Sequence, residues 1–211
     1  MTVFPMFGEQ FHLFSASQKP EGIQGLHYQP SFLTQEDERK ILDAIDNRGV
    51  WLNDLRRRVQ HYGYRYDYKS RGIDPSMRAA SFPGWLSELA QQVIDGLRLD
   101  SVFDQAIINE YLPGQGIYGH VDCEPCFDET IASLSLGSCC IMDFVEPETR
   151  RRYKLVLEPR SALLLQGEAR YKWKHGIASR KFDEINGVRV ARSRRVSITF
   201  RRVILGAKTG S

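Results

Sequence analysis

Residues 195–201 read Arg-Val-Ser-Ile-Thr-Phe-Arg, and this stretch indicates the fold most directly. Successive side chains of a β-strand point to opposite faces of the sheet. One face of this strand is apolar and comprises Val196, Ile198 and Phe200. The other face is polar and comprises Arg195, Ser197, Thr199 and Arg201. The alternation predicts a strand that packs on a core with its apolar face, while its polar face either has a specific role or is simply wetted at the edge of a sheet.

Short strands of this kind continue through the second half of the chain. Turn signals such as Pro113-Gly114 and Asn186-Gly187 separate apolar runs there. The predicted strands are residues 105–111, 130–136, 139–144, 153–157, 162–166, 171–177 and 194–203. Many short, evenly spaced strands are typical of a sandwich or jelly roll. We therefore expect a mainly β fold with flanking helices, whose core over residues 105–203 is a sandwich or a jelly roll.

The first 104 residues are predicted to form an α+β extension. One helix is expected to begin at Thr34 and end at Gly49, because a capping pattern precedes apolar residues at helical spacing. A second helix is expected after Pro83, where an apolar stripe begins. Between them, the tyrosine-rich residues 60–68 predict a strand or hairpin that leads into a flexible loop.

The 211 residues are the length of one catalytic domain, so we expect a single domain over residues 1–211. Residues 1–15 lack the features of a signal peptide, and no apolar run approaches the roughly 18 residues that span a membrane. We therefore expect a soluble protein with no membrane partner, located in the cytoplasm, or in the nucleus if the source is eukaryotic. A monomer is favoured.

The cysteines and the basic residues offer further candidate sites. Without an export signal, Cys123, Cys126, Cys139 and Cys140 are expected to be reduced thiols. Zinc is disfavoured because the second pair is adjacent and would lie on opposite faces of a strand. The net charge is +3, and arginines gather at residues 56–58, 150–152 and 189–202. Each run could contact a phosphate backbone, but taken alone each is better interpreted as a solvated loop or strand face.

His120-Val121-Asp122 is the first motif with catalytic chemistry. In an extended chain His120 and Asp122 point to the same side, so the two side chains can hold one metal ion. A second histidine would complete two nitrogens and one carboxylate on one face of an octahedron and leave three positions open. His175 is the natural candidate, because the remaining histidines precede the strand-rich half.

The polar face of residues 195–201 supports a second ligand. Arg195 and Arg201 would be costly inside a barrel unless anions neutralise them. Their α-carbons are about 20 Å apart along a strand, and long side chains could close much of that gap on a five-carbon dicarboxylate. The alternative is an edge strand with a wet polar face.

Together these residues resemble the AlkB-like 2-oxoglutarate dioxygenases. The matching elements are spaced as in that family and comprise Asn109-x-Tyr111, Pro113-Gly114, His120-x-Asp122, His175-Gly176-Ile177, Arg195 and Arg201. The resemblance covers roughly residues 105–203 and implies that they form a double-stranded β-helix (jelly-roll) core. Residues 60–64, 133–138 and 167–171 look closest to the branch with the oxygenase domain of tRNA wobble-uridine hydroxylases.

The resemblance implies the cofactors Fe(II), 2-oxoglutarate and O₂. His120, Asp122 and His175 would be the metal ligands and the catalytic centre. Arg195 would pair with the distal carboxylate of 2-oxoglutarate, helped by Tyr111. Ser197 stands where some members carry asparagine, so its contact with the cosubstrate is in doubt.

The resemblance also implies a second set of contacts. Asn109 and Arg201 would lie near the keto acid end of 2-oxoglutarate. Glu124 points the same way as Asp122, at a position where some members place an acidic residue beside the base; a solvated loop glutamate is an equal alternative.

A nucleotide-recognition lid would cover a single-stranded or base-flipped nucleotide. Its residues would be Tyr62, Tyr64 and Tyr66, with Arg65 holding phosphate, although core packing competes for some of the tyrosines. Arg170 would contact either a substrate phosphate or Glu168.

The expected function is oxidative demethylation or hydroxylation of alkylated or modified bases in DNA or RNA, as in nucleic-acid repair. One alternative is hydroxylation of a tRNA wobble-uridine side chain, and another is a dioxygenase that acts on a protein or a small molecule. A third is a binding module without catalysis, in which the histidines are structural.

Overall fold

The computed structural model describes residues 22–53, 55–70, 72–74 and 76–205. The assessment of residues 1–15 as lacking a signal peptide lies outside these ranges. In chain order the elements are β1 (Leu26–Gln29), α1 (Gln35–Arg48), β2 (Val59–Tyr62), α2 (Gly84–Leu97), β3 (Gln105–Tyr111), β4 (Ile117–His120), β5 (Ile131–Gly137), β6 (Cys140–Val145), β7 (Arg152–Leu157), β8 (Ser161–Leu165), α3 (Gly167–Tyr171), β9 (Lys174–Ile177), β10 (Phe182–Ile185), β11 (Val188–Ala191) and β12 (Arg195–Arg201).

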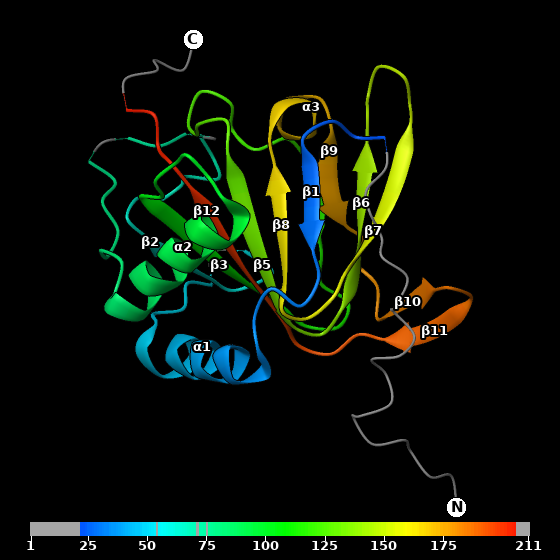
Figure 1. The fold of residues 1–211 in the computed structure, drawn as a ribbon, viewed down its shortest axis with the longest axis horizontal. Helices are drawn as coiled ribbons and strands as arrows, with labels where there is room; N and C mark the ends of the chain where they lie inside the picture. Colours follow the sequence, from blue (N-terminus) through cyan, green and yellow to red (C-terminus); the bar gives the residue numbers. More distant parts are fainter. Residues whose placement is uncertain (1–21, 54, 71, 75, 206–211) are drawn as a thin grey trace, which may run out of the picture.

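Two antiparallel sheets face each other (Figure 1). The major sheet has the order β1-β8-β5-β12-β3-β2, and the minor sheet has the order β4-β9-β6-β7. A separate hairpin of β10 and β11 projects beyond them, at the lower right of Figure 1. The arrangement confirms the predicted mainly β fold with a jelly-roll core.

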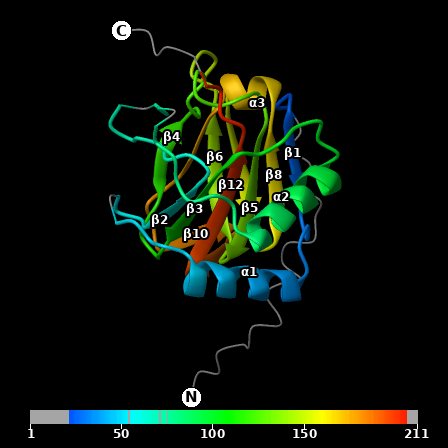
Figure 2. The ribbon, with the colours of Figure 1, turned by 90° about the vertical axis from the view of Figure 1, so that its left-hand side faces the viewer.

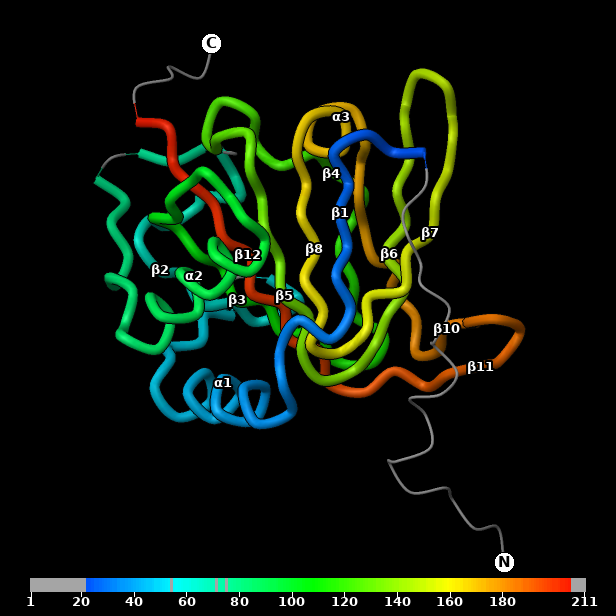
Figure 3. The backbone as a smooth tube through the Cα atoms, in the orientation of Figure 1, coloured from blue at the N-terminus to red at the C-terminus, as the bar shows by residue number. Residues whose placement is uncertain are grey.

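β12 lies inside the major sheet, where it pairs with β3 on one side and β5 on the other. Figure 3 shows this strand, in red, crossing between them. The alternative of a wet edge strand is therefore wrong. Both faces of β12 are covered, and its polar face lies between the two sheets.

Side chains alternate between the two faces of the strands, and this alternation produces two apolar cores. One lies between the sheets and includes Leu163 of β8 and Phe144 of β6. The other lies under α1 and α2 and includes Ile198 and Phe200 of β12. Figure 2 shows both long helices on the side of the major sheet. The minor sheet therefore has no long helix on its outer face within the described ranges.

Both predicted helices are confirmed. The Thr34 side chain accepts a hydrogen bond from the backbone of Asp37, whose carboxylate accepts from the backbone of Thr34, and this capping box starts α1. The helix ends before Gly49. Pro83 precedes the first residue of α2, where its fixed φ suits a helix start. None of the described helices is both long and apolar enough to cross a membrane.

The boundaries of several elements differ from the prediction. The expected strand at residues 171–177 starts only at Lys174, because α3 reverses the chain between β8 and β9. Only Val59–Tyr62 of the tyrosine-rich run forms a regular strand, since Gly63 adopts a positive φ of 77° directly after it. The sequence did not predict the short strands β1, β4, β10 and β11, because the pattern of so short a strand cannot be distinguished from that of a loop.

Cys123 and Cys126 form a disulfide, so the expectation of four reduced thiols is wrong for this pair. The chain makes a tight turn in which the backbone N–H of Cys126 donates to the carbonyl of Cys123, and this turn brings the two side chains together. Cys139 and Cys140 are free cysteines, as expected.

Candidate active site

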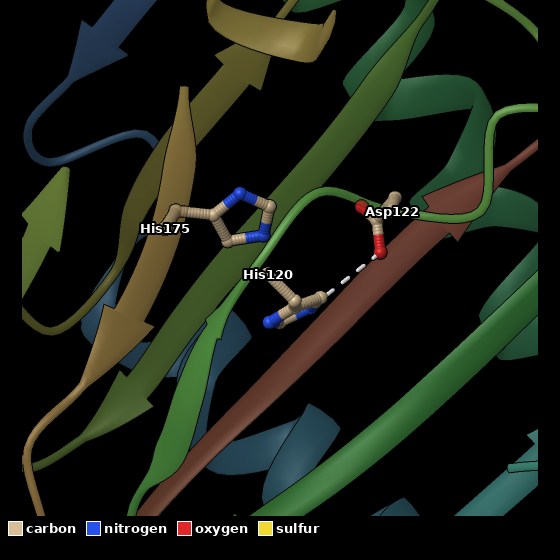
Figure 4. Close-up of side chains that lie close together, drawn as sticks. All are labelled: His120, Asp122 and His175. Atoms are coloured by element: carbon tan, nitrogen blue, oxygen red, sulfur yellow. Dashed lines mark ion pairs between the residues drawn. The ribbon is translucent and has the colours of Figure 1, made fainter. Parts of the chain in front are cut away.

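Three side chains converge between the sheets, and they come from two adjacent strands. His120 ends β4, Asp122 follows it, and His175 on β9 is the direct register partner of His120. One ligand atom from each residue lies within 4.8 Å of the others (Figure 4). The two imidazole centroids are 4.6 Å apart, and His120 Nε2 lies 3.8 Å from Asp122 Oδ1. The structure thus brings together the predicted metal ligands.

Glycines let β4 approach β9 closely enough for this convergence. A Cβ atom on Gly176 would lie 2.8 Å from the backbone nitrogen of Gly119, a distance that packed carbon atoms do not tolerate. A Cβ on Gly116 would lie 2.2 Å from the carbonyl oxygen of Ile177. Both positions therefore require glycine for the backbone to pass.

The hydrogen bond of His120 and the burial of His175 each leave an imidazole nitrogen suited to bind a metal. His120 Nδ1 lies 2.8 Å from the carbonyl oxygen of Tyr118, which as an acceptor fixes the proton on Nδ1 and leaves Nε2 free to bind a metal. Burial lowers the pKa of His175 to about 4, so its imidazole is uncharged near neutral pH. Two imidazoles and a carboxylate suit a divalent metal of the iron type.

Asp122 is held in place by two arginines. Arg201 Nη2 donates to Asp122 Oδ1 at 3.0 Å, and Arg170 Nη1 donates to the Asp122 carbonyl oxygen at 2.9 Å. Burial alone would raise the pKa of Asp122, but the positive charge of Arg201 and the neighbouring histidines outweigh it and keep the pKa below its usual value. The carboxylate is therefore ionised and oriented before any metal binds.

A cavity of about 1630 Å³ opens over this triad. Its lining also includes Tyr118, Asp143, Val145 and Lys174 of the minor sheet, so the volume covers both the space over the triad and the open mouth beside it. The whole is larger than the roughly 300–1,000 Å³ of common ligand pockets and can take a small cosubstrate with part of a larger substrate. Arg195, Ser197, Thr199 and Arg201 all line it, which shows that the polar face of β12 forms its floor. The sequence prediction of a specific role for this face is consistent with that placement.

Arg195 fits the carboxylate of a bound anion. The residue is 3% exposed, and its Nη2 donates to Ser135 Oγ at 2.8 Å. Its Nε and Nη1 are buried without a hydrogen-bond partner among the described residues. Its guanidinium lies 5.4 Å from the ring centroid of Tyr111, its register neighbour on β3. A buried guanidinium with unpaired donors suits a charge-assisted contact with a carboxylate.

Asn109 also lines the cavity, and its Oδ1 accepts a hydrogen bond from Arg57 Nε at 2.8 Å. That contact with Arg57, which lies just before β2, fixes the Asn109 side chain.

The site has the features of an enzyme that binds a metal beside an anionic cosubstrate. These features are a jelly roll, two histidines with one carboxylate, and a buried arginine whose Nε and Nη1 have no partner among the described residues.

Comparisons with known proteins give the family. Residues 25–201 match the 2OG-Fe(II) oxygenase superfamily. The chain is 38% identical over 192 residues to protein L905 of Acanthamoeba polyphaga mimivirus, with 89% of each chain covered. It is 36% identical over 210 residues to the "Alkylated DNA repair protein ALKBH8 homolog" of Arabidopsis thaliana, covering 86% of this chain and 59% of that protein.

Two further relatives place the match in context. The mouse "tRNA (carboxymethyluridine(34)-5-O)-methyltransferase ALKBH8" is 36% identical, with 76% of this chain but only 25% of that protein covered. The solved structure of OsALKBH1 superposes with a TM-score of 0.65 at 18% identity, covering 84% of this chain and 96% of that one, which supports the fold. The chain belongs to the 2OG-Fe(II) oxygenase superfamily and is homologous to AlkB-like proteins. It is a dioxygenase that uses Fe(II), 2-oxoglutarate and O₂.

The predicted nucleotide contacts are brought together only in part. Tyr66 lines the cavity, and Glu124 is exposed at its margin. Tyr62 and Tyr64 are buried in the two cores and do not line it, so the prediction that they cover a substrate is wrong. Arg65 is exposed and is likewise not among the lining residues.

Arg170 corrects another prediction. It is 1% exposed, and its guanidinium donates to backbone carbonyls of the loop after β4, those of Asp122, Cys123, Phe127 and Asp128. Glu168 instead pairs with Lys172 at 2.8 Å. Arg170 therefore holds the loop that carries Asp122, because its donors are used by carbonyls and none faces the surface.

Tyr68 is a cavity residue that the sequence prediction missed. It lines the cavity together with Tyr66, and the two ring centroids are 5.2 Å apart. Burial raises the pKa of Tyr68, so its hydroxyl stays protonated, and this hydroxyl has no hydrogen-bond partner among the described residues. The period-two run of tyrosines was the available signal, but it did not show where the run leaves the core and enters the cavity.

Proposed function

We propose that this dioxygenase oxidises a methyl group or other substituent on a base of DNA or RNA, presented in a single strand or flipped out of a duplex. The observation that carries the proposal is the cavity: its volume of about 1630 Å³ exceeds the needs of a dicarboxylate, and Tyr66 and Tyr68 form an aromatic pair on its wall. A base that leaves its stack typically stacks on aromatic side chains. The names of the Arabidopsis and mouse relatives, which concern DNA repair and tRNA, support the same class.

The chain's residues would act in the reaction mainly by orienting the reactants. His120, Asp122 and His175 would hold Fe(II), and Arg195 beside Tyr111 would bind the distal carboxylate of 2-oxoglutarate. When bound, these groups supply oxidising power by coupling decarboxylation of the keto acid to insertion of oxygen into a C–H bond.

Arg201 would keep Asp122 ionised and aimed at the metal, and Asn109, fixed by Arg57, would face the keto acid end. Tyr66 and Tyr68 would keep the base apart from bulk water. Glu124, at the rim, would accept a hydrogen bond from a base amino group. Hydroxylation of an N-methyl carbon would release formaldehyde, whereas hydroxylation of a carbon substituent would leave a stable alcohol.

Mass spectrometry of modified DNA and RNA oligonucleotides and of tRNA, after incubation with Fe(II), 2-oxoglutarate and O₂, tests the proposal. We expect loss of a methyl group or gain of one oxygen on a base, with matching succinate, and no product from His120→Ala. Succinate formation without any change in nucleic acid would overturn the nucleic-acid assignment and leave a protein or small molecule as the substrate.

A second candidate is hydroxylation of a wobble-uridine side chain in tRNA. The name of the mouse relative, which specifies carboxymethyluridine at position 34, favours it. The chain spans only 25% of that protein, so the named activity belongs to the longer relative. Hydroxylated uridine in tRNA digests, with no reaction on methylated oligonucleotides, would select this candidate over demethylation.

A further inference from the structure

The minor sheet has an outer face that the two cores do not use. Along β6 and β7 every second residue packs into the core between the sheets, including Phe144 and Leu155. The intervening residues point the other way. At one end of this outer face, Ile185 and Val190 of the β10–β11 hairpin cover Ile141 and Val156.

The rest of the outer face, which we call the open face, comprises Tyr118, Asp143, Val145, Arg152, Lys154 and Lys174. Five of its members are neighbours through strand register: Val145 pairs with Lys174 on one side and with Arg152 on the other, and Asp143 pairs with Lys154. Tyr118 lies on β4, the strand next to β9. Adjacent strands are about 4.8 Å apart, so Lys174 and Arg152 lie roughly 10 Å apart across the sheet.

The open face is positively charged. Arg152, Lys154 and Lys174 are exposed, and only the half-buried Asp143 opposes them. Within the part of the chain that the structure describes, none of the three cations takes part in an ion pair. By contrast, the neighbouring basic residues Lys172 and Arg151 pair with Glu168 and Glu146. The open face therefore holds three cations against one carboxylate, and none of the three is ion-paired within the described chain.

Tyr118 joins the open face to the active site. Its side chain is 95% exposed, the highest value among the large apolar residues that are exposed. Its carbonyl oxygen accepts the hydrogen bond of His120 Nδ1, so its backbone is fixed beside a metal ligand. Tyr118 and Lys174 both line the cavity, which makes the open face continuous with the cavity mouth. A solvent-exposed aromatic ring beside several basic side chains is suited to stack on a nucleobase.

We propose that the open face binds the strand of nucleic acid that flanks the nucleotide in the cavity. A neighbouring base stacks on Tyr118, and phosphates lie against Lys174, Arg152 and Lys154. The inference rests on the proposed function and adds to it the path by which a single strand leaves the site. Charge complementarity selects a polyanion, and the exposed aromatic ring selects one that carries bases.

The test compares two triple variants of the full chain. One neutralises the open face with Arg152→Gln, Lys154→Gln and Lys174→Gln. The matched control removes three exposed cations from α1 with Arg39→Gln, Lys40→Gln and Arg48→Gln. Both lose the same net charge, so a general loss of attraction affects them equally. Circular dichroism confirms that each is folded.

Binding of a fluorescein-labelled single-stranded RNA about 15 nucleotides long, a length near the upper end of common single-strand sites, is measured by anisotropy against salt concentration. Each lost phosphate contact lowers the slope of log K against log salt by about 0.7, so the open-face variant should lose about 2 from the slope. That loss corresponds to roughly 100-fold weaker binding at 0.1 M salt, while the control keeps the wild-type slope. Equal slopes for the two triple variants would overturn the inference.

A single substitution tests the stacking contact separately. Tyr118→Ala should weaken binding roughly tenfold without changing the salt slope, and Tyr118→Trp should restore it. Equal affinity of wild type and Tyr118→Ala would show that Tyr118 does not contact the bound strand.

The failures of the two proposals are distinguishable. If the wild type neither binds nor oxidises any oligonucleotide, the proposed function fails and this inference fails with it. If the wild type binds and oxidises an oligonucleotide but the open-face variant binds it as tightly, only this inference fails.

Discussion

Val196, Ile198 and Phe200 on one face of β12 are at most 1% exposed and pack under α1 and α2. Arg195 and Arg201 on the other face are nearly as buried, at 3% and 8%, yet they carry charge. The two faces therefore hardly differ in exposure. They differ in where their partners come from, because the apolar residues contact only other parts of the chain, whereas Arg195 keeps two donors without a partner among the described residues.

This comparison separates the structural from the catalytic contribution of one strand. Substitutions on the apolar face should lower the free energy of unfolding and leave cosubstrate affinity unchanged. Substitutions at Arg195 should lower cosubstrate affinity and leave the free energy of unfolding nearly unchanged, because the partner of its two unpaired donors is a ligand.

The largest expected effect is on the apolar face. Phe200 is fully buried, and its ring lies 5.6 Å from that of Phe103 and 6.3 Å from that of Phe82. Phe200→Ala should lower the free energy of unfolding by about 3–5 kcal/mol, because it leaves a cavity in the core under the helices. Urea denaturation measures the loss. The KM for 2-oxoglutarate of the folded fraction should not change, and a large rise in that KM would show that the two faces are not independent.

Asp183 provides a buried charge whose partners are within the chain, in contrast to Arg195. Its carboxylate accepts two hydrogen bonds from Arg192, at 2.5 and 2.8 Å, and one from Arg180 at 2.7 Å. Burial alone would raise the pKa of Asp183, but the two arginines outweigh it and lower the pKa. Asp183→Asn should therefore cost about 3 kcal/mol of stability at neutral pH.

The pH dependence of this loss follows from the lowered pKa. The stabilisation is present above the unfolded pKa of about 3.9 and is lost as pH falls through the lower folded value. The difference in unfolding free energy between wild type and Asp183→Asn should thus be constant from pH 7 to about 5 and shrink below pH 4. A difference that grows on acidification would contradict the assigned direction.

The sequence predicted those parts of the fold that repeat a simple period. The alternation at residues 195–201 placed both faces of β12 correctly, and the capping pattern at Thr34 located α1. His120 and Asp122 are two residues apart on an extended chain, so local geometry alone brought them together. His175 needed the pairing of β4 with β9, which no local pattern encodes.

The errors have a common physical origin in long-range contacts. Tyr62, Tyr64, Tyr66 and Tyr68 share one parity, yet the positive φ of Gly63 turns the chain, and the run divides between core and cavity. Arg170 has its role only because the loop after β4 folds over it and presents four carbonyls. A pattern within one segment cannot specify which other segment packs on it.

Arg195→Gln gives the smallest free-energy change of the three and the most specific one. The glutamine keeps part of the length and removes the charge, so the KM for 2-oxoglutarate should rise roughly 30-fold, equivalent to about 2 kcal/mol. The free energy of unfolding without cosubstrate should change by less than about 1 kcal/mol, because Arg195 has only one hydrogen-bond partner among the described residues and removal of its buried charge relieves a desolvation cost. Arg202→Gln, an exposed arginine directly after the same strand and outside the cavity lining, is the matched control that loses the same charge and should leave that KM unchanged. If Arg195→Gln instead lowered stability as Phe200→Ala does and kept the wild-type KM, Arg195 would be a structural residue and the contrast between the two faces of β12 would be lost.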